Sequence, residues 1–326
     1  MDLSIIKCHG SGNDFVLIDE MNAELFLEQQ RPQLAQLLCD RRSILGADGV
    51  LFVQKSSSAD VKMRMFNADG SEAQTCGNGL RCVARFVAER LGRTRVSIET
   101  MKGISAAAQE VDTVPGVKAY SVELGPISIK TKDLPLIVDT EVLVNAKLAP
   151  LSEKFNFTAV SAPNPHLVAM VEKIDVAELE TVGERASHLP GILPEKANVS
   201  FCRVLDGNSL AVATFERGSG LTQSCGSAMG ASALAACISG KLPFGSWFSV
   251  FNFGGYIAAC ATEQANESYK ISIKGNATFV FAATYSLDLD KMTLRKTLDG
   301  VTYDEEITAY ERVHDKGRQV MTQDVK

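Results

Sequence analysis

The chain has 326 residues, of which 45% are hydrophobic and 22% charged, a composition typical of a globular protein with a buried core rather than a disordered chain. The formal net charge is −6 and the basic residues are scattered singly, so no basic patch predicts nucleic-acid binding. No segment approaches the roughly 20 apolar residues of a membrane span, and residues 1–10 lack a signal-peptide pattern, so the sequence predicts a cytoplasmic protein without membrane association.

Eight cysteines and four histidines are dispersed along the chain. They form no C-x-x-C pair and show no zinc-type spacing, so neither a disulfide framework nor a metal site is expected. A free cysteine is most often a small buried hydrophobic residue. A functional cysteine must therefore be distinguished by its surroundings.

The first candidate segment is FNADGSEAQTCGNGLRC, residues 66–82. Residues 61–65 alternate apolar and basic side chains, which predicts a strand entering this polar loop. After Cys76, apolar residues recur at spacings of three and four up to residue 91 and Gly92 follows. This pattern predicts a helix with Gly92 as its C-cap.

A second segment, FERGSGLTQSCGSAMGA from Phe215, repeats the first 149 residues later. The repeat pairs Gln74 with Gln223, Cys76 with Cys225 and Gly77 with Gly226. Residues 209–215 are β-prone, and residues 229–238 are almost entirely apolar or small, which is typical of a buried helix. Both halves therefore predict strand, polar loop, cysteine and helix, which indicates a duplication with pseudo-twofold symmetry.

Each of the two cysteines is expected at the start of a helix. Unpaired N–H groups and the positive end of the helix dipole make a thiol easier to ionise there and can bind a carboxylate. A thiolate on one face of a carbon and a thiol on the other can remove a proton and return one with inversion. Packing in the core is the alternative role of a lone cysteine, and a structural disulfide between Cys76 and Cys225 is disfavoured in a reducing compartment.

The motifs occur in an order that resembles the diaminopimelate epimerase family over about residues 3–286. They are HGSGNDF at 9–15, GADG at 46–49, the 66–82 segment, NPH at 164–166, ERGSGLTQSCGS at 216–227 and GNATFVF at 275–281. The resemblance implies an isomerase that converts L,L-diaminopimelate to meso-diaminopimelate without pyridoxal phosphate, metal or other cofactor. Its partner would be a small-molecule amino acid, and a homodimer is among the assemblies compatible with it.

The resemblance also implies roles for individual residues. Cys76 and Cys225 would be the base and acid pair, with His166 and Glu216 as polar residues near the thiols. The substrate-binding residues would comprise the helix-start N–H groups of Gly77, Asn78, Gly226 and Ser227, and the positions for the distal end of the substrate, Asn13, Asn67, Asn164, Asn198 and Arg217. Asn13 and Asn67 could instead shape turns, and His166 could be a structural loop residue.

Two positions depart from the family pattern, because Leu221 stands where a glutamate is usual and Pro163 where a glycine is common before the NPH motif. These departures keep open a histidine racemase or a broader amino-acid racemase of the same superfamily. A catalytically silent amino-acid-binding protein is the alternative from another class. It is disfavoured because both cysteines are present.

The fold class implied by the resemblance is α+β. It has two pseudo-symmetric domains, each a curved, mostly antiparallel sheet wrapped around a central helix. The expected N-terminal domain comprises residues 1–126 plus a returning strand at about 275–286, and the C-terminal domain comprises residues 127–274. Residues 287–326 are mostly polar and are expected to form a peripheral C-terminal extension.

Overall fold

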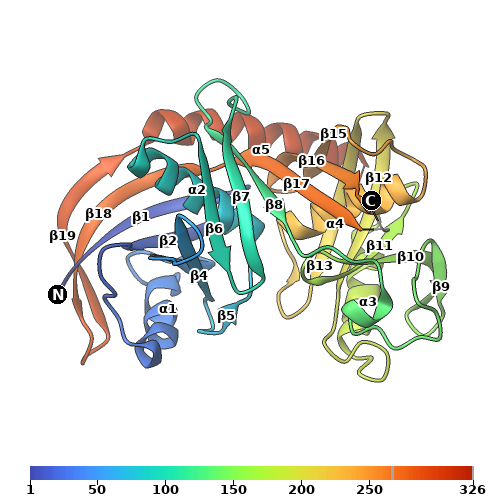
Figure 1. The fold of residues 1–326 in the computed structure, drawn as a ribbon, viewed down its shortest axis with the longest axis horizontal. Coiled ribbons are helices and arrows are strands. Elements are labelled where there is room, and N and C mark those ends of the chain that lie inside the picture. The colour runs from blue at the N-terminus through green and yellow to red at the C-terminus, as the bar shows by residue number, and fades with distance from the viewer. Residues whose placement is uncertain (266–267, 325–326) are drawn as a thin grey trace. The chain divides into compact units, whose positions relative to one another are not determined.

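The computed structural model describes residues 1–265 and 268–324 of the chain. They divide into two compact units (Figure 1), unit 1 with residues 1–122 and 275–313 and unit 2 with the described residues of 123–274 and those from 314 onward. The division falls near the expected boundaries at 126/127 and 274/275. No helix in the described part of the chain is both long enough and apolar enough to cross a membrane.

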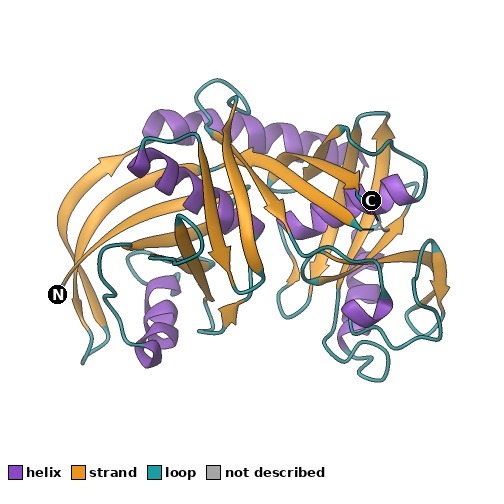
Figure 2. Cartoon of the chain, viewed as in Figure 1, coloured by secondary structure: helices purple, strands orange, loops and turns teal. Residues whose placement is uncertain are grey.

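Unit 1 is built mainly from strands (Figure 2), which are β1 (Asp2–Gly10), β2 (Asn13–Glu20), β3 (Gly49–Gln54), β4 (Val61–Asn67), β5 (Glu72–Ala73), β6 (Arg95–Thr100), β7 (Gly103–Glu110), β8 (Ala119–Leu124), β18 (Thr278–Asp288) and β19 (Thr293–Thr302). Its helical segments are η1 (Glu28–Gln30), α1 (Arg31–Cys39) and α2 (Gly77–Leu91). Strand β2 pairs antiparallel with β1 and parallel with β3, and β4 pairs antiparallel with β3 and β5 and parallel with β6. Strands β6, β7 and β8 continue as an antiparallel run.

Helix α2 is the central helix of unit 1. It begins after Cys76, its N-cap, and ends at Gly92, which adopts the left-handed conformation with φ 63° as the sequence predicted. Its apolar residues Leu80, Val83 and Val87 are buried. The helix contacts β1, β2, β3, β4, β6 and β7, so the strands of the unit surround it.

Unit 2 contains β9 (Ala146–Leu148), β10 (Ser152–Ser161), β11 (Pro165–Met170), β12 (Asn198–Asp206), β13 (Ser209–Glu216), β14 (Gly220–Leu221), β15 (Trp247–Asn252), β16 (Gly255–Glu263) and β17 (Tyr269–Asn276). Its helical segments are η2 (Thr131–Asp133), α3 (Val176–Ser187) and α4 (Gly226–Ile238). Strand β11 pairs antiparallel with β10 and parallel with β12, and β13 pairs antiparallel with β12 and β14 and parallel with β15. This is the pairing scheme of unit 1 repeated.

The repeated chain order extends to the helices. Helix α1 lies between β2 and β3, and α3 lies between β11 and β12. Helices α2 and α4 follow β5 and β14, and all of α4 from Gly226 to Cys237 is buried. Helix α4 contacts β10, β11, β12, β13, β15 and β16. The predicted fold, two related α+β units each with a sheet around a central helix, is confirmed.

The end of the chain, expected as a peripheral extension, forms a strand and a helix. Strand β18 pairs antiparallel with β1, and β19 pairs antiparallel with β18, so the three run side by side in Figure 1. Helix α5 (Asp304–Asp324) follows, and it buries Tyr310 and Met321. Residues 287–326 thus form an edge strand, β19, and a helix with a buried face, two elements that their polar composition did not indicate.

Candidate active site

One group of predicted site residues lies at the start of α2, in unit 1. Cys76 has an extended backbone with φ −150°, and its Sγ accepts a hydrogen bond from the N–H of Gly79 at 3.4 Å. The same Sγ lies 3.9 Å from Asn13 Oδ1, to which Asn78 Nδ2 donates at 3.3 Å. The structure thus brings together Asn13, Cys76 and Asn78, three residues predicted separately from two distant motifs.

Asn13 is held by a charged loop beside it. Its Nδ2 donates to Asp48 Oδ2 at 2.7 Å, and Arg41 bridges Asp48 and Asp14 at 2.6 and 2.7 Å. Burial acts to raise the pKa of Asp14, but hydrogen bonds from Arg41 and Lys7 outweigh it and lower this pKa to about 2. The GADG and HGSGNDF motifs are therefore joined by ion pairs that fix where Asn13 points.

Asn67 occupies a turn. Its Nδ2 donates to Ser71 Oγ at 3.0 Å, its backbone N–H donates to Ser71 O at 2.8 Å, and its carbonyl accepts from Gly70 N at 2.9 Å. These contacts fit the turn-forming role that the sequence left open. They do not link Asn67 to the other predicted residues.

Another group of predicted site residues lies at the start of α4, in unit 2. Cys225 is the N-cap, it is buried, and its Sγ lies 3.5 Å from Ser227 Oγ. Burial and the Glu216 carboxylate raise the pKa of Cys225, and the Ser227 hydroxyl and the Ala228 N–H act in the opposite direction. Glu216 accepts a hydrogen bond from Thr222 Oγ1 at 2.6 Å. Both predicted cysteines therefore begin a central helix, one in each unit.

A polar cluster forms around Arg217. Its Nη2 donates to Asn164 Oδ1 at 3.3 Å, its Nη1 to the carbonyl of Glu195 at 2.9 Å, and its backbone N–H to Asn198 Oδ1 at 3.0 Å. Three residues predicted to bind the distal end of the substrate are thus neighbours in unit 2. The cluster joins a guanidinium, which suits a carboxylate, to amides that fix its orientation.

His166 lies on β11, beside Asn198 of β12 in the parallel register. It is fully buried, and neither ring nitrogen has a hydrogen-bond partner among the described residues. Burial, with a smaller contribution from the Arg217 guanidinium, lowers the pKa of His166 to about 3. The ring is therefore neutral near pH 7, and one nitrogen can donate while the other accepts.

Two arginines of α2 were not predicted as part of the site. Arg81 and Arg85 are buried behind the first turns of the helix, and their guanidinium groups donate to the backbone carbonyls of Asn276 and Ala277. The GNATFVF motif is thus tied to the helix that begins at Cys76. Alignment of the two repeats could have drawn attention to Arg81, because the equivalent position of the second half is a glycine, Gly230.

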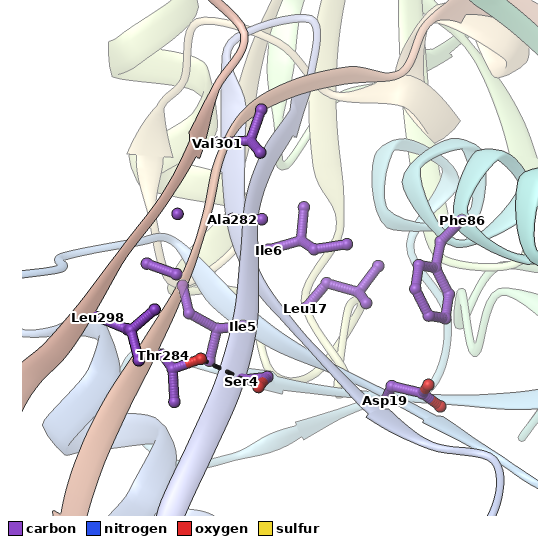
Figure 3. A pocket seen from close by; sticks show the side chains of 12 residues that line it. Ser4, Ile5, Ile6, Leu17, Asp19, Phe86, Ala282, Thr284, Leu298 and Val301 are labelled. Carbon is purple, nitrogen blue, oxygen red and sulfur yellow. Dashed lines mark hydrogen bonds between the residues drawn. The ribbon is translucent and has the colours of Figure 1, made fainter.

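A pocket of about 350 Å³ lies elsewhere in unit 1 (Figure 3). Its wall is mostly apolar and includes Ile6, Leu17, Phe86 and Leu298. None of the predicted site residues lines it. In the described residues, no group of three or more His, Cys, Asp or Glu side chains is placed to hold a metal ion.

Solved structures confirm the architecture. A methylitaconate-delta-isomerase superposes with a TM-score of 0.64, with 13% identity over 90% of this chain and 97% of that one. A hydroxyproline epimerase from Agrobacterium vitis, with bound trans-4-hydroxy-L-proline, superposes with a TM-score of 0.61, with 15% identity over 87% of this chain and 92% of that one. At these identities the likeness concerns the fold.

Sequence comparison establishes the family. The family model for diaminopimelate epimerase matches residues 5–129 and 158–280. A diaminopimelate epimerase of Clostridium acetobutylicum is 42% identical over 95% of this chain and 93% of that protein, and one of Ligilactobacillus salivarius is 38% identical over 95% and 98%. One of Listeria monocytogenes is 37% identical over 88% and 89%. With two N-cap cysteines at equivalent positions of a duplicated fold, the chain belongs to the diaminopimelate epimerase family.

Proposed function

We propose that this chain is a diaminopimelate epimerase, an isomerase that inverts one α-carbon of L,L-diaminopimelate to give meso-diaminopimelate. The observation that carries the proposal is the placement of Cys76 and Cys225 at the N-caps of the two equivalent helices, in a chain of this family. The reaction needs no pyridoxal phosphate in this scheme. Meso-diaminopimelate is a precursor of lysine and peptidoglycan.

The proposed chemistry uses the two thiols as a base and an acid. A thiolate takes the α-proton and becomes a thiol, while the other thiol gives its proton to the opposite face and becomes a thiolate. Charge and atoms balance without an oxidant or a reductant. Each of the two units, which we propose as the two epimerase domains, supplies one cysteine.

The carbanion between these two steps needs stabilisation. We assign this to N–H groups in the first turns of α2 and α4, those of Gly77, Asn78, Gly226 and Ser227. The first N–H groups of a helix have no acceptor within the helix, and the positive end of the dipole adds to their effect on a carboxylate. Asn78 and Ser227 are also in contact with groups that surround the thiols, which supports this assignment.

Recognition of the distal end of the substrate falls to Arg217 with Asn164 and Asn198, and to Asn13 and Asn67. The contacts among Arg217, Asn164 and Asn198 support the first three most strongly. His166 and Glu216 complete the proposed site. Glu216 acts on the ionisation of Cys225, and neutral His166 offers a buried donor and acceptor.

A histidine racemase or a broader amino-acid racemase remains the second candidate because of Leu221. This side chain is partly buried against the apolar core of unit 2, so this position offers a hydrocarbon surface where a carboxylate is usual. A silent amino-acid-binding protein would need neither thiol. An assay with diaminopimelate and with histidine distinguishes these candidates.

A cytoplasmic location and a homodimeric assembly complete the proposal. All eight cysteines are free in the structure, which fits a reducing compartment. Fractionation of the native cells and sedimentation of the purified protein test the two statements independently.

The assay offers L,L-diaminopimelate and L-histidine separately to the purified, reduced protein in D₂O, without added cofactor. Proton NMR then follows the α-proton signal of each amino acid. Loss of the signal from diaminopimelate alone supports the proposed substrate. Exchange with histidine alone assigns the protein to the racemase alternative, and exchange with neither contradicts both.

A further inference from the structure

The turn between β1 and β2 leads directly into Asn13, whose side-chain oxygen lies 3.9 Å from Cys76 Sγ. The two residues of the turn, Ser11 and Gly12, both have positive φ, 54° and 81°. A non-glycine residue such as Ser11 is strained in this region and keeps the conformation only where its surroundings hold it. The approach of Asn13 to the sulfur of Cys76 therefore depends on the groups that hold this turn.

Three side chains hold the turn by hydrogen bonds. Gly12 N–H donates to His9 Nδ1 at 3.3 Å. Ser11 N–H donates to Asn276 Oδ1 at 2.8 Å, and Ser11 Oγ accepts from Arg81 Nη2 at 3.0 Å. The three are also joined to one another, because Asn276 donates from Nδ2 to the carbonyl of His9 and accepts at its own carbonyl from Arg81 Nε. We call His9, Asn276 and Arg81 the turn network.

The C-terminal helix α5 brings Tyr310 against this network. The rings of Tyr310 and His9 meet edge to face, with their centroids 4.4 Å apart and their planes at 67°. Tyr310 is buried, which raises its pKa, and the Arg81 guanidinium acts on this pKa in the opposite direction. Arg81 is itself fully buried, and its Nη1 has no hydrogen-bond partner among the described residues. Tyr310 therefore interacts with two of the three members of the turn network.

A buried ion pair fixes this part of α5. Glu306 Oε1 lies 2.5 Å from Arg85 Nη1, which also donates to the carbonyl of Ala277 at 2.7 Å. Separating such a pair would leave a buried charge without a partner, so α5 and α2 are held in one geometry. Glu306 and Tyr310 are four residues apart and so share a face of α5. The ion pair therefore holds that face, and with it the Tyr310 ring, in place.

We propose that Tyr310 is a positioning residue for the reaction, because its ring packs on His9 and so holds the turn that sets Asn13 against Cys76. Residue 310 lies beyond the motifs at 9–281 on which the family resemblance depends, so the resemblance implies no role for it. The inference rests on the proposed function for its meaning in catalysis. Its effect on the surroundings of Cys76 can be measured without substrate.

Kinetics distinguish positioning from packing. Tyr310→Leu should lower kcat/KM for diaminopimelate about tenfold or more, because small displacements of reacting groups are costly. The measurement is made at a temperature where circular dichroism shows every variant to be folded. Tyr310→Phe keeps the ring and should recover most of the activity. An unchanged kcat/KM in folded Tyr310→Leu would overturn the proposal, and so would a Tyr310→Phe that is impaired as much as Tyr310→Leu.

Tyr285 supplies the matched control. It is another buried tyrosine of unit 1, on β18, where it packs in the apolar cluster that contains Leu3 and Phe52. Tyr285→Leu should lower the Tm but leave kcat/KM of the folded protein unchanged. An equal loss of kcat/KM in Tyr285→Leu and Tyr310→Leu would reduce the role of Tyr310 to general packing and contradict the proposal.

A double-mutant cycle tests whether Tyr310 acts through His9. His9→Leu removes the acceptor of the Gly12 N–H and should also lower kcat/KM. Because the two residues act on one turn, adding Tyr310→Leu to His9→Leu should cause little further loss. Fully additive losses would show that Tyr310 acts by another route. Tyr310→Met, whose flexible side chain fills a cavity with less strain, carries the same expectations and serves in the cycle if Tyr310→Leu does not fold.

The substrate-free measurement is alkylation of the reduced protein by iodoacetamide at one fixed pH, with each cysteine read separately by peptide mass spectrometry. Tyr310→Leu should loosen the turn and speed alkylation of Cys76 by about threefold or more, since the rate at fixed pH follows access to the thiol and its ionisation. The rate at Cys225 should stay unchanged. An unchanged rate at Cys76 would contradict the proposal. Because no turnover is needed, this result decides the inference even for a protein that fails the diaminopimelate assay and so refutes the proposed function.

Discussion

Arg217 donates a hydrogen bond from Nη2 to Asn164 Oδ1 at 3.3 Å, which joins the loop before the second cysteine to the NPH motif. The guanidinium is partly buried, and its backbone N–H is held by Asn198. This arrangement presents a preformed cationic fork at one end of the proposed substrate site in unit 2. The strength with which this guanidinium binds a carboxylate depends on its forked geometry as well as on its charge.

Replacing Arg217 by alanine should lower kcat/KM for diaminopimelate about ten- to a hundredfold, mainly through KM. Losing hydrogen bonds between a charged pair costs about 1.5–3 kcal/mol. Arg217→Lys should recover only part of the loss. Steady-state kinetics measure it, with Lys130→Ala as an exposed cation control in the same unit. An unchanged KM in Arg217→Ala would remove this residue from substrate recognition.

Removing either N-cap thiol should abolish epimerisation. Because one cysteine takes the proton and the other returns it, Cys76→Ala and Cys225→Ala should each lower kcat more than about a hundredfold while circular dichroism stays unchanged. Cys260→Ala is the matched control, because Cys260 is another buried cysteine of unit 2, on β16, and has no proposed catalytic part. Normal turnover in either N-cap variant would refute the assignment of two bases.

Stability should fall in mild acid partly because of His166. The pKa of His166 is about 3 in the folded chain, against an ordinary value of 6.5 for histidine, so between these values the unfolded state binds a proton that the folded state does not. This contribution to the free energy of unfolding is complete above pH 6.5 and is lost as pH falls toward 3. The loss is about 2 kcal/mol at pH 5. Urea unfolding of wild type and His166→Gln at pH 7.5 and 5 measures the difference. Between pH 7.5 and 5 the wild type should lose more stability than His166→Gln. Equal losses would show that folding does not lower the pKa of His166.

Gly183 on α3 leaves room for the side chain of Phe215 on β13. A Cβ at this position would lie 2.2 Å from Phe215 Cγ, and Phe215 directly precedes Glu216 and Arg217. Gly183→Ala should therefore destabilise the protein by about 1–3 kcal/mol in thermal or urea unfolding. Gly191→Ala, where a Cβ would meet no atom within 4 Å, is the control and should be close to neutral. A neutral Gly183→Ala would mean that the ring of Phe215 moves freely.

Local sequence signals predicted much of the two core repeats. The alternation before residue 66 and the three-and-four spacing after Cys76 correspond to β4 and α2, and the small apolar run after Cys225 corresponds to α4. These elements are specified by local periodicity and by their caps. The pairing scheme is a long-range property, and only the duplication and the family resemblance pointed to it.

Other features could not be predicted because they depend on contacts distant in sequence. Arg81 reads as an ordinary charged helix residue, yet it is buried because the carbonyl of Asn276 lies against α2. Glu306 looks like part of a polar tail, but it pairs with Arg85. The turn contact of Asn67 with Ser71 was left open by the sequence, and its proposed part in substrate binding stays a prediction.

The central claim is that two thiols act on opposite faces of one carbon, and isotope placement early in the reaction tests it most directly. L,L-diaminopimelate is incubated with the reduced protein in D₂O, stopped at low conversion, separated from meso-diaminopimelate and analysed by mass spectrometry. The two-cysteine account predicts one deuterium in the meso product and almost none in the recovered L,L substrate, because the returned proton comes from a second, solvent-equilibrated thiol. Deuterium in the recovered substrate at a level comparable to the product would indicate a single base and contradict it.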